Sequence, residues 1–160
     1  MPRGPRILLE NACYHIINRG NQKQDIFFDE EDFRYFLKFF KHYKKKYPVK
    51  IFGYCLMPNH IHIILQARYS KNLRLFMKGL AQTYTAWFND KYKKAGHLWQ
   101  GRFKNMIVHK DEYFLECIRY VETNPVRAGL TASPAEYTWS SYRDRLYGNK
   151  NKILDLPDST

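Results

Sequence analysis

The stretch Tyr54-Cys55-Leu56-Met57-Pro58-Asn59-His60-Ile61-His62-Ile63-Ile64-Leu65 decides the fold. A Pro-Asn pair separates two apolar runs, and this pattern predicts a β-hairpin because proline and asparagine favour turns. Successive side chains of a strand point to opposite faces, so His60 and His62 share one face and lie about 6 to 7 Å apart. Two imidazoles at this separation can bind one cation, although a short H-x-H pattern also fits polar residues on a half-exposed strand.

The segments around this hairpin predict an alternation of strands and helices. Strands are expected over 13–18, 49–56, 60–65 and 103–109, and the two intervening helices follow Asp29 and Ser70, which are suitable N-caps. Each helix has an apolar stripe with helical spacing. The order β-α-β-β-α-β predicts an α+β, ferredoxin-like fold with an antiparallel sheet and both helices on one face. The other face is then open, and His60 and His62 lie on it.

A third helix is predicted after the fourth strand. Asp111 is a suitable N-cap, and Pro125 should end the helix near Asn124 because the residue before a proline avoids helical geometry. Tyr120 and Asn124 are four residues apart, so they are neighbours on one flank at the edge of the apolar stripe. From there Tyr120 can reach the histidine face, although spacing alone fits an amphipathic edge residue better.

Composition predicts a polyanionic partner. The chain has 27 Lys and Arg against 15 acidic residues, a formal net charge of +12, which favours nucleic acid or an anionic membrane surface. We expect no membrane-spanning helix and no signal peptide, and the three widely spaced cysteines indicate reduced, mostly buried thiols in a cytoplasmic protein. The length predicts one domain over 1–160, with a basic leader over 1–11 and a flexible tail over 146–160.

Basic and aromatic side chains mark candidate DNA contacts. The lysines of the first helix fit a solvated face as well as a phosphate track. The segment 97–104 mixes aromatic, amide and basic groups around Gly101, which suits a nucleotide strand, although Trp99 is at least as well explained by packing. His15 either lies near the histidine pair or packs in the sheet, and packing is favoured. The candidate DNA contacts are Arg19, Lys71, Arg74, Lys78, Trp99, Arg102, Lys104 and Arg127.

Three stretches resemble a known family. They are Tyr-Cys-Leu-Met-Pro-Asn-His-Ile-His at 54–62, Leu-Trp-Gln-Gly-Arg-Phe at 98–103 and Arg-Tyr-Val-Glu-Thr-Asn-Pro-Val-Arg-Ala-Gly at 119–129. These stretches are similar to the single-tyrosine HUH transposases, above all the REP-associated tyrosine transposase branch, as is Trp-Ser-Ser-Tyr at 139–142. The resemblance implies that Tyr120 is the nucleophile and that His60, His62 and Asn124 bind a divalent cation. Many relatives carry glutamine where this chain has Asn124, which is one methylene shorter.

The implied activity is cleavage and rejoining of single-stranded DNA through a 5′-phosphotyrosine. Mg²⁺ or Mn²⁺ suits a site completed by amide, water and phosphate oxygens, although a pure histidine pair also attracts zinc. Glu116, one turn before Tyr120, is either a helper of the nucleophile or an ordinary surface carboxylate. The expected partner is single-stranded DNA with a hairpin, from a repeat or a transposon end. A monomer is the favoured state, and a dimer stays open. Two alternatives stay open: a non-catalytic nucleic-acid-binding module, and a metal-dependent phosphodiesterase that uses water.

Overall fold

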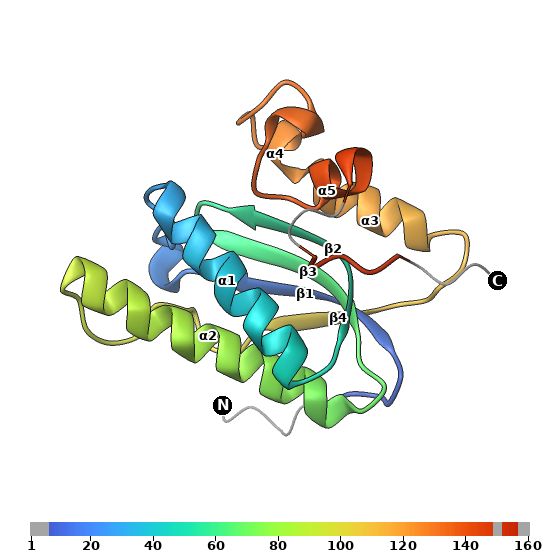
Figure 1. Ribbon diagram of the computed structural model, residues 1–160, viewed down its shortest axis with the longest axis horizontal. Helices are drawn as coiled ribbons and strands as arrows, with labels where there is room; N and C mark the ends of the chain where they lie inside the picture. Colours follow the sequence, from blue (N-terminus) through green and yellow to red (C-terminus); the bar gives the residue numbers. More distant parts are fainter. Residues whose placement is uncertain (1–6, 149–151, 157–160) are drawn as a thin grey trace.

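The computed structural model describes residues 7–148 and 152–156. Among them, four strands form one antiparallel sheet in the order β2-β3-β1-β4. Helices α1 and α2 cover one face of the sheet and α3 lies on the other (Figure 1), so the predicted ferredoxin-like α+β fold is confirmed. The elements are β1 (Cys13–Arg19), α1 (Glu30–Lys46), β2 (Lys50–Met57), β3 (His60–Gln66), α2 (Ser70–Tyr92), β4 (Lys104–Val108) and α3 (Phe114–Glu122).

Side-chain alternation along β3 assigns the two faces of the sheet. Ile61, Ile63 and Leu65 are buried in the core between the sheet and α1 and α2. Ile64 belongs to the second core, which α3 builds on the opposite face with Phe114, Ile118 and Val121. His60 and His62 therefore lie on the α3 face, as the sequence pattern predicts.

The two helices of the first layer pack closely. A Cβ at Gly79 of α2 would lie 2.4 Å from the ring of Tyr43 on α1, so only glycine permits this approach. The hydroxyls of Tyr43 and Thr83 are 2.6 Å apart across the same contact. α2 starts with Ser70, whose hydroxyl donates to Glu10 instead of capping the helix, and it continues to Tyr92. The loop that leads to β4 therefore begins at Lys93.

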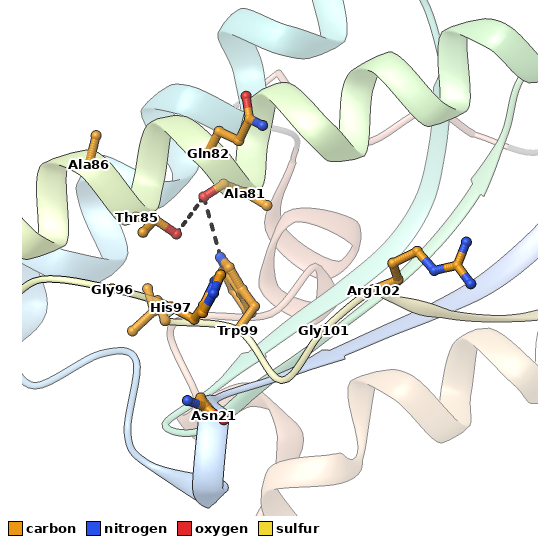
Figure 2. A pocket seen from close by; sticks show the side chains of 11 residues that line it. Asn21, Ala81, Gln82, Thr85, Ala86, Gly96, His97, Trp99, Gly101 and Arg102 are labelled. Carbon is orange, nitrogen blue, oxygen red and sulfur yellow. Dashed lines mark hydrogen bonds between the residues drawn. The ribbon is translucent and has the colours of Figure 1, made fainter. Parts of the chain in front are cut away.

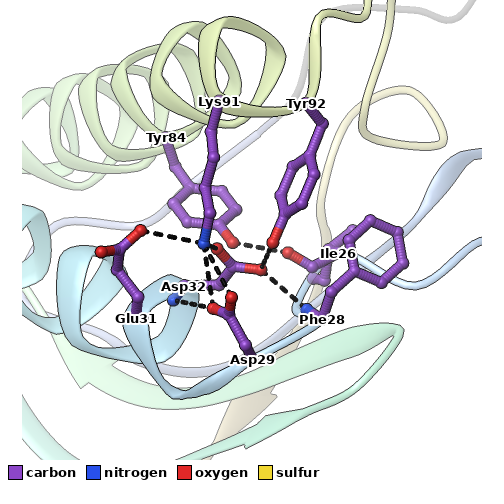
Figure 3. A network of polar contacts seen from close by, with 8 residues as sticks. All are labelled: Ile26, Phe28, Asp29, Glu31, Asp32, Tyr84, Lys91 and Tyr92. Carbon is purple, nitrogen blue, oxygen red and sulfur yellow. Dashed lines mark hydrogen bonds and ion pairs between the residues drawn. The ribbon is translucent and has the colours of Figure 1, made fainter.

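An ion-pair network joins the start of α1 to the end of α2 (Figure 3). Asp29 caps α1 as predicted, because its carboxylate accepts from the backbone N–H of Asp32 at 3.1 Å. Lys91 of α2 lies 2.8 Å from the fully buried carboxylate of Asp32 and 2.9 Å from Asp29 and Glu31. Asp32 also accepts from the hydroxyl of Tyr92, so its buried charge is neutralised and hydrogen-bonded. These contacts hold the last turn of α2, which contains Lys91 and Tyr92, against the start of α1.

The third helix is shorter than predicted at both ends. Asp111 accepts from the backbone N–H of Tyr113, but α3 starts only at Phe114. It ends at Glu122, and a separate short helix α4 (Asn124–Arg127) follows. Pro125 lies in the first turn of α4, where its missing N–H leaves no hydrogen bond unmade. The proline therefore does not end α3 directly, and Asn124 opens the next helix.

The segment after α4 returns to the sheet through η2 (Pro134–Glu136) and α5 (Tyr142–Tyr147). Ile153 and Leu154 are buried, and the carboxylate of Asp155 accepts from the backbone of Ile51 at 2.9 Å. The flexible tail expected over 146–160 therefore does not describe residues 152–156, because their apolar side chains complete the core. The rest of that tail after Gly148, and residues 1–6 of the expected basic leader, lie outside the described residues.

Two further expectations can be compared with the structure. Cys13 and Cys55 are buried, as expected, and burial raises the pKa of the Cys13 thiol to about 12. Such a thiol stays protonated and unreactive at neutral pH. Within 7–148 and 152–156, every helix is too short or too polar to cross a bilayer.

Candidate metal and nucleophile site

Three imidazoles meet on the α3 face of the sheet. The rings of His60 and His62 lie 4.9 Å apart between centroids. His15 of β1 lies beside them, with its Nε2 2.9 Å from Nδ1 of His62. Sequence reasoning favoured simple packing for His15. It could have been placed better, because Tyr14 and Ile16 are core residues and the residue between them must face the other side.

The hydrogen bonds of the two histidines assign their tautomers. Nδ1 of His60 lies 2.7 Å from the side-chain oxygen of Asn59, so this nitrogen carries the proton and donates. Nδ1 of His62 donates in the same way to His15, while the side-chain amide of Asn124 lies 2.6 Å from Nε2 of His62. Both rings then have their lone pair on Nε2. Neutral imidazoles held through the other ring nitrogen are the usual form of metal-binding histidines.

The surroundings keep these imidazoles uncharged. Burial, aided by the positive charge of Arg19, lowers the pKa of His60 to about 4. Burial together with His60, His15 and nearby cations lowers the pKa of His62 to about 3. At neutral pH both side chains therefore offer a lone pair without first losing a proton.

Helix α3 and its continuation bring Tyr120 and Asn124 to the same place. Asn124 contacts His62 directly, as described above, and the ring of Tyr120 lies edge-on to His15 at 6.4 Å between centroids. Tyr120 is half exposed, which leaves its hydroxyl accessible to a large substrate. The four residues singled out from the sequence, His60, His62, Tyr120 and Asn124, thus lie together on one face. Glu116 is exposed on α3 and makes no hydrogen bond to Tyr120.

Arg127 packs against the tyrosine. Its guanidinium carbon lies 4.0 Å from the centre of the Tyr120 ring, and it donates to the backbone oxygen of Tyr120 and to the hydroxyl of Thr123. These contacts fix the guanidinium beside the phenol, where a phosphate next to Tyr120 would also meet its charge. The sequence predicted Arg127 only as a general DNA contact.

The donor set suits a divalent cation whose coordination is shared with water or phosphate. Among the described residues, no group of three or more His, Cys, Asp or Glu side chains could hold a metal ion. His60 and His62 supply two nitrogens, and a half-turn of the Asn124 amide would present its oxygen. Two imidazoles and one amide leave several positions for oxygen atoms, a shell that Mg²⁺ and Mn²⁺ accept.

The segment 137–147 anchors α3 to the sheet. Residues Trp139 and Ser141 pair with the outer edge of β2, through Leu56 N–H to Trp139 O at 2.8 Å and Ser141 N–H to Tyr54 O at 2.9 Å. The Ser141 hydroxyl donates to Glu122 at the end of α3, which is 3% exposed. Arg145 forms an ion pair with the same carboxylate at 3.0 Å. Sequence reasoning noted the Trp-Ser-Ser-Tyr stretch but not this role.

We expect Arg145→Met to lower the free energy of unfolding by about 3 kcal/mol, because it leaves the Glu122 carboxylate buried without its ion-pair partner. Urea unfolding followed by circular dichroism measures the change. Arg143→Met, on the exposed side of α5, is the control and should unfold like the wild type. The double variant Glu122→Gln/Arg145→Met should recover much of the loss. An Arg145→Met protein as stable as the wild type would show that the ion pair does not hold α3 in place.

The structure places the candidate DNA contacts on two surfaces. Arg127 lies at the tyrosine. The others, except Lys71, line hollows between the segment 96–104 and either α2 or the end of β1. Trp99 is 9% exposed, and its indole N–H donates to the backbone oxygen of Ala81 at 3.3 Å (Figure 2). It therefore packs under α2, as the packing explanation for Trp99 predicts, and a DNA contact by this residue stays a prediction. Arg19, Lys71, Arg74, Lys78, Arg102 and Lys104 are exposed.

Comparisons with known proteins agree with this architecture. The profile of the family described as "Transposase IS200 like" matches residues 9–124. A Haemophilus influenzae protein named as a REP-associated tyrosine transposase is 26% identical over 107 residues, a match that spans 60% of this chain and 60% of that protein.

Two solved structures share the fold. One is a REP-associated tyrosine transposase bound to a REP hairpin, with a TM-score of 0.71 and 17% identity, covering 100% of this chain and 96% of the other. The second is a Deinococcus radiodurans protein assigned as a transposase, with a TM-score of 0.50 and 17% identity over 77% of this chain and 97% of the other.

Proposed function

Because this chain belongs to the IS200-like transposase family, we propose that it cleaves and rejoins single-stranded DNA through a covalent bond to Tyr120. The observation that carries the proposal is the contact between α4 and the hairpin, where the Asn124 amide lies 2.6 Å from Nε2 of His62. Asn124 begins α4 directly after α3, the helix that carries Tyr120, so the contact supports a position of the phenol near the imidazoles. A half-exposed phenol beside a candidate cation site is the arrangement that phosphoryl transfer to tyrosine requires.

The proposed reaction is an in-line substitution at phosphorus. The phenol oxygen of Tyr120 forms a bond to phosphorus as its proton passes to water, and the bond from phosphorus to the 3′ oxygen breaks. That oxygen takes up a proton and leaves as a 3′ hydroxyl. The phosphate stays joined to the 5′ end of the downstream strand, and attack by a 3′ hydroxyl on this phosphotyrosine rejoins DNA without a nucleotide cofactor.

His60, His62 and Asn124 are the residues that would hold Mg²⁺ or Mn²⁺. The ion, when bound, neutralises negative charge on a nonbridging phosphate oxygen. The chain's own residues position the groups: Asn59 and His15 fix the two imidazoles, and Arg127 holds one face of the phenol. Arg127 and Arg19 add positive charge near His62, where the phosphate would lie.

The proposed substrate is DNA with a hairpin next to a single strand. This proposal draws on the relative that was solved with a REP hairpin and on the net charge of +12. We further propose that the chain acts as a monomer, because its histidine pair, amide and tyrosine come together within one chain. We also propose that it acts in the cytoplasm.

A labelled hairpin with single-stranded flanks, taken from repeats beside the gene, tests the proposal. With Mn²⁺ we expect an adduct that survives denaturing gel electrophoresis and disappears after protease treatment, and with EDTA we expect none. A 3′ label should move with the protein, whereas a 5′ label should appear on a short free strand, because Tyr120 keeps the downstream fragment. Fully paired DNA is the control. Adduct with the 5′ label, or none under any metal, would contradict the proposal.

A further inference from the structure

Two neighbouring hollows lie between α2 and the segment 96–104, and a third lies between this segment and the end of β1. The first, of about 610 Å³, is drawn in Figure 2, and the second, of about 640 Å³, continues along α2. The third, of about 180 Å³, lies at the end of β1. Arg102 lines all three hollows, which we together call the α2 groove.

The walls of the α2 groove combine positive charge with an apolar floor. Arg74 and Lys78 project from α2 one turn apart, are exposed, and form no ion pair with a described acidic residue. Met77, Ala81 and the buried ring of Trp99 make the floor. Between Arg74 and Thr85 the helix wall is about 17 Å long at 1.5 Å per residue. Cationic side chains beside an apolar floor suit a ligand that has several negative charges and also flat, weakly polar rings.

The α2 groove leads to the histidine site. Its third hollow is lined by Ile17 and Arg19 of β1, which pair in register with His62 and His60 of β3. Arg19 lies close enough to His60 for its charge to lower the pKa of that imidazole. A strand whose phosphate lies at the histidines can therefore pass over Arg19 at the end of β1 into the groove.

We propose that the α2 groove binds the single-stranded DNA that adjoins the scissile phosphate. Its phosphates lie on Arg74, Lys78 and Arg102, and its bases lie against Met77 and Ala81. This inference rests on the proposed function for the position of the scissile phosphate. Paired DNA fits less well, because proteins read a duplex by inserting an element into its grooves, whereas a charged hollow with an apolar floor admits unstacked bases.

Fluorescence anisotropy with the full chain in EDTA, where no cleavage occurs, tests the proposal. The probes are a blunt hairpin, the same hairpin with a 5′ or a 3′ single-stranded flank, and the flanks alone. The groove variant is Arg74→Gln/Lys78→Gln, and Lys41→Gln/Lys45→Gln on α1 removes the same charge elsewhere. Circular dichroism checks that both proteins are folded, and Arg102→Gln provides a second groove variant.

The groove variant should lose about tenfold in affinity for at least one flanked hairpin, beyond any loss for the blunt hairpin. Its slope of log affinity against log salt for that DNA should fall by about 1.4, since each single-strand phosphate contact contributes about 0.7. The α1 control should affect flanked and blunt hairpins equally. Equal losses for blunt and flanked DNA in the groove variant would overturn the proposal and assign the groove to the stem. Adduct formation by the wild type is measured separately, so failure of the proposed chemistry is distinguishable from failure of the groove.

Discussion

Tyr120→Phe should bind hairpin DNA within about threefold of the wild-type affinity and form no covalent adduct with it. The substitution removes one oxygen from a half-exposed ring, while the stacking of Arg127 and the packing of α3 stay in place. Without that oxygen, residue 120 has no phenol oxygen that can form the bond to phosphorus. Anisotropy measures the affinity, and a denaturing gel with 3′-labelled DNA measures the adduct.

Tyr113→Phe is the matched control, because Tyr113 is also an exposed tyrosine and lies at the N-cap of α3, seven residues before Tyr120. This variant should form adduct at the wild-type rate. If Tyr120→Phe still formed the adduct, Tyr120 would not be the nucleophile. Free 5′ phosphate ends from both the wild type and Tyr120→Phe would favour the water-dependent phosphodiesterase, and salt-sensitive binding without any cleavage would favour the binding module.

The sequence predicts the parts of this site that depend on local periodicity. Alternation along 60–65 assigns His60 and His62 to the open face, and helical spacing makes Tyr120 and Asn124 neighbours. Both predictions need only the geometry of one strand or one helix. Their meeting depends on where α3 lies on the sheet. That position follows from Phe114, Ile118 and Val121, whose apolar stripe has no other surface to cover once α1 and α2 occupy the first face.

The contacts that the sequence does not predict are tertiary. His15 meets His62 only because β1 pairs with β3 in a register that puts Ile17 opposite His62. The anchor of α3 joins Glu122 to Arg145, 23 residues away, through a turn whose direction no local pattern fixes. Trp99 lies among polar and basic residues in the sequence, a context typical of an exposed segment. It is nevertheless buried, because α2 packs over it. In each case a partner distant in sequence decides the role of the residue.

His62→Ala should reduce Mn²⁺ affinity by more than about 100-fold and abolish adduct formation at low millimolar Mn²⁺, because it removes one of two nitrogen ligands. Isothermal titration of the free protein measures the affinity without any DNA. His15→Ala keeps both ligands and loses only the hydrogen bond that orients His62, so we expect a smaller loss of about tenfold.

His42→Ala is the control for this pair, since His42 is exposed on α1 and should bind Mn²⁺ and form adduct like the wild type. The order of the two effects separates a ligand from a residue that positions a ligand. If His15→Ala lost more affinity than His62→Ala, His15 itself would be the ligand, and Nδ1 of His62 would have to carry a lone pair. Equal Mn²⁺ affinity in all three variants would instead move the cation away from the hairpin, and Tyr120 would then need another source of positive charge, of which Arg127 is the nearest.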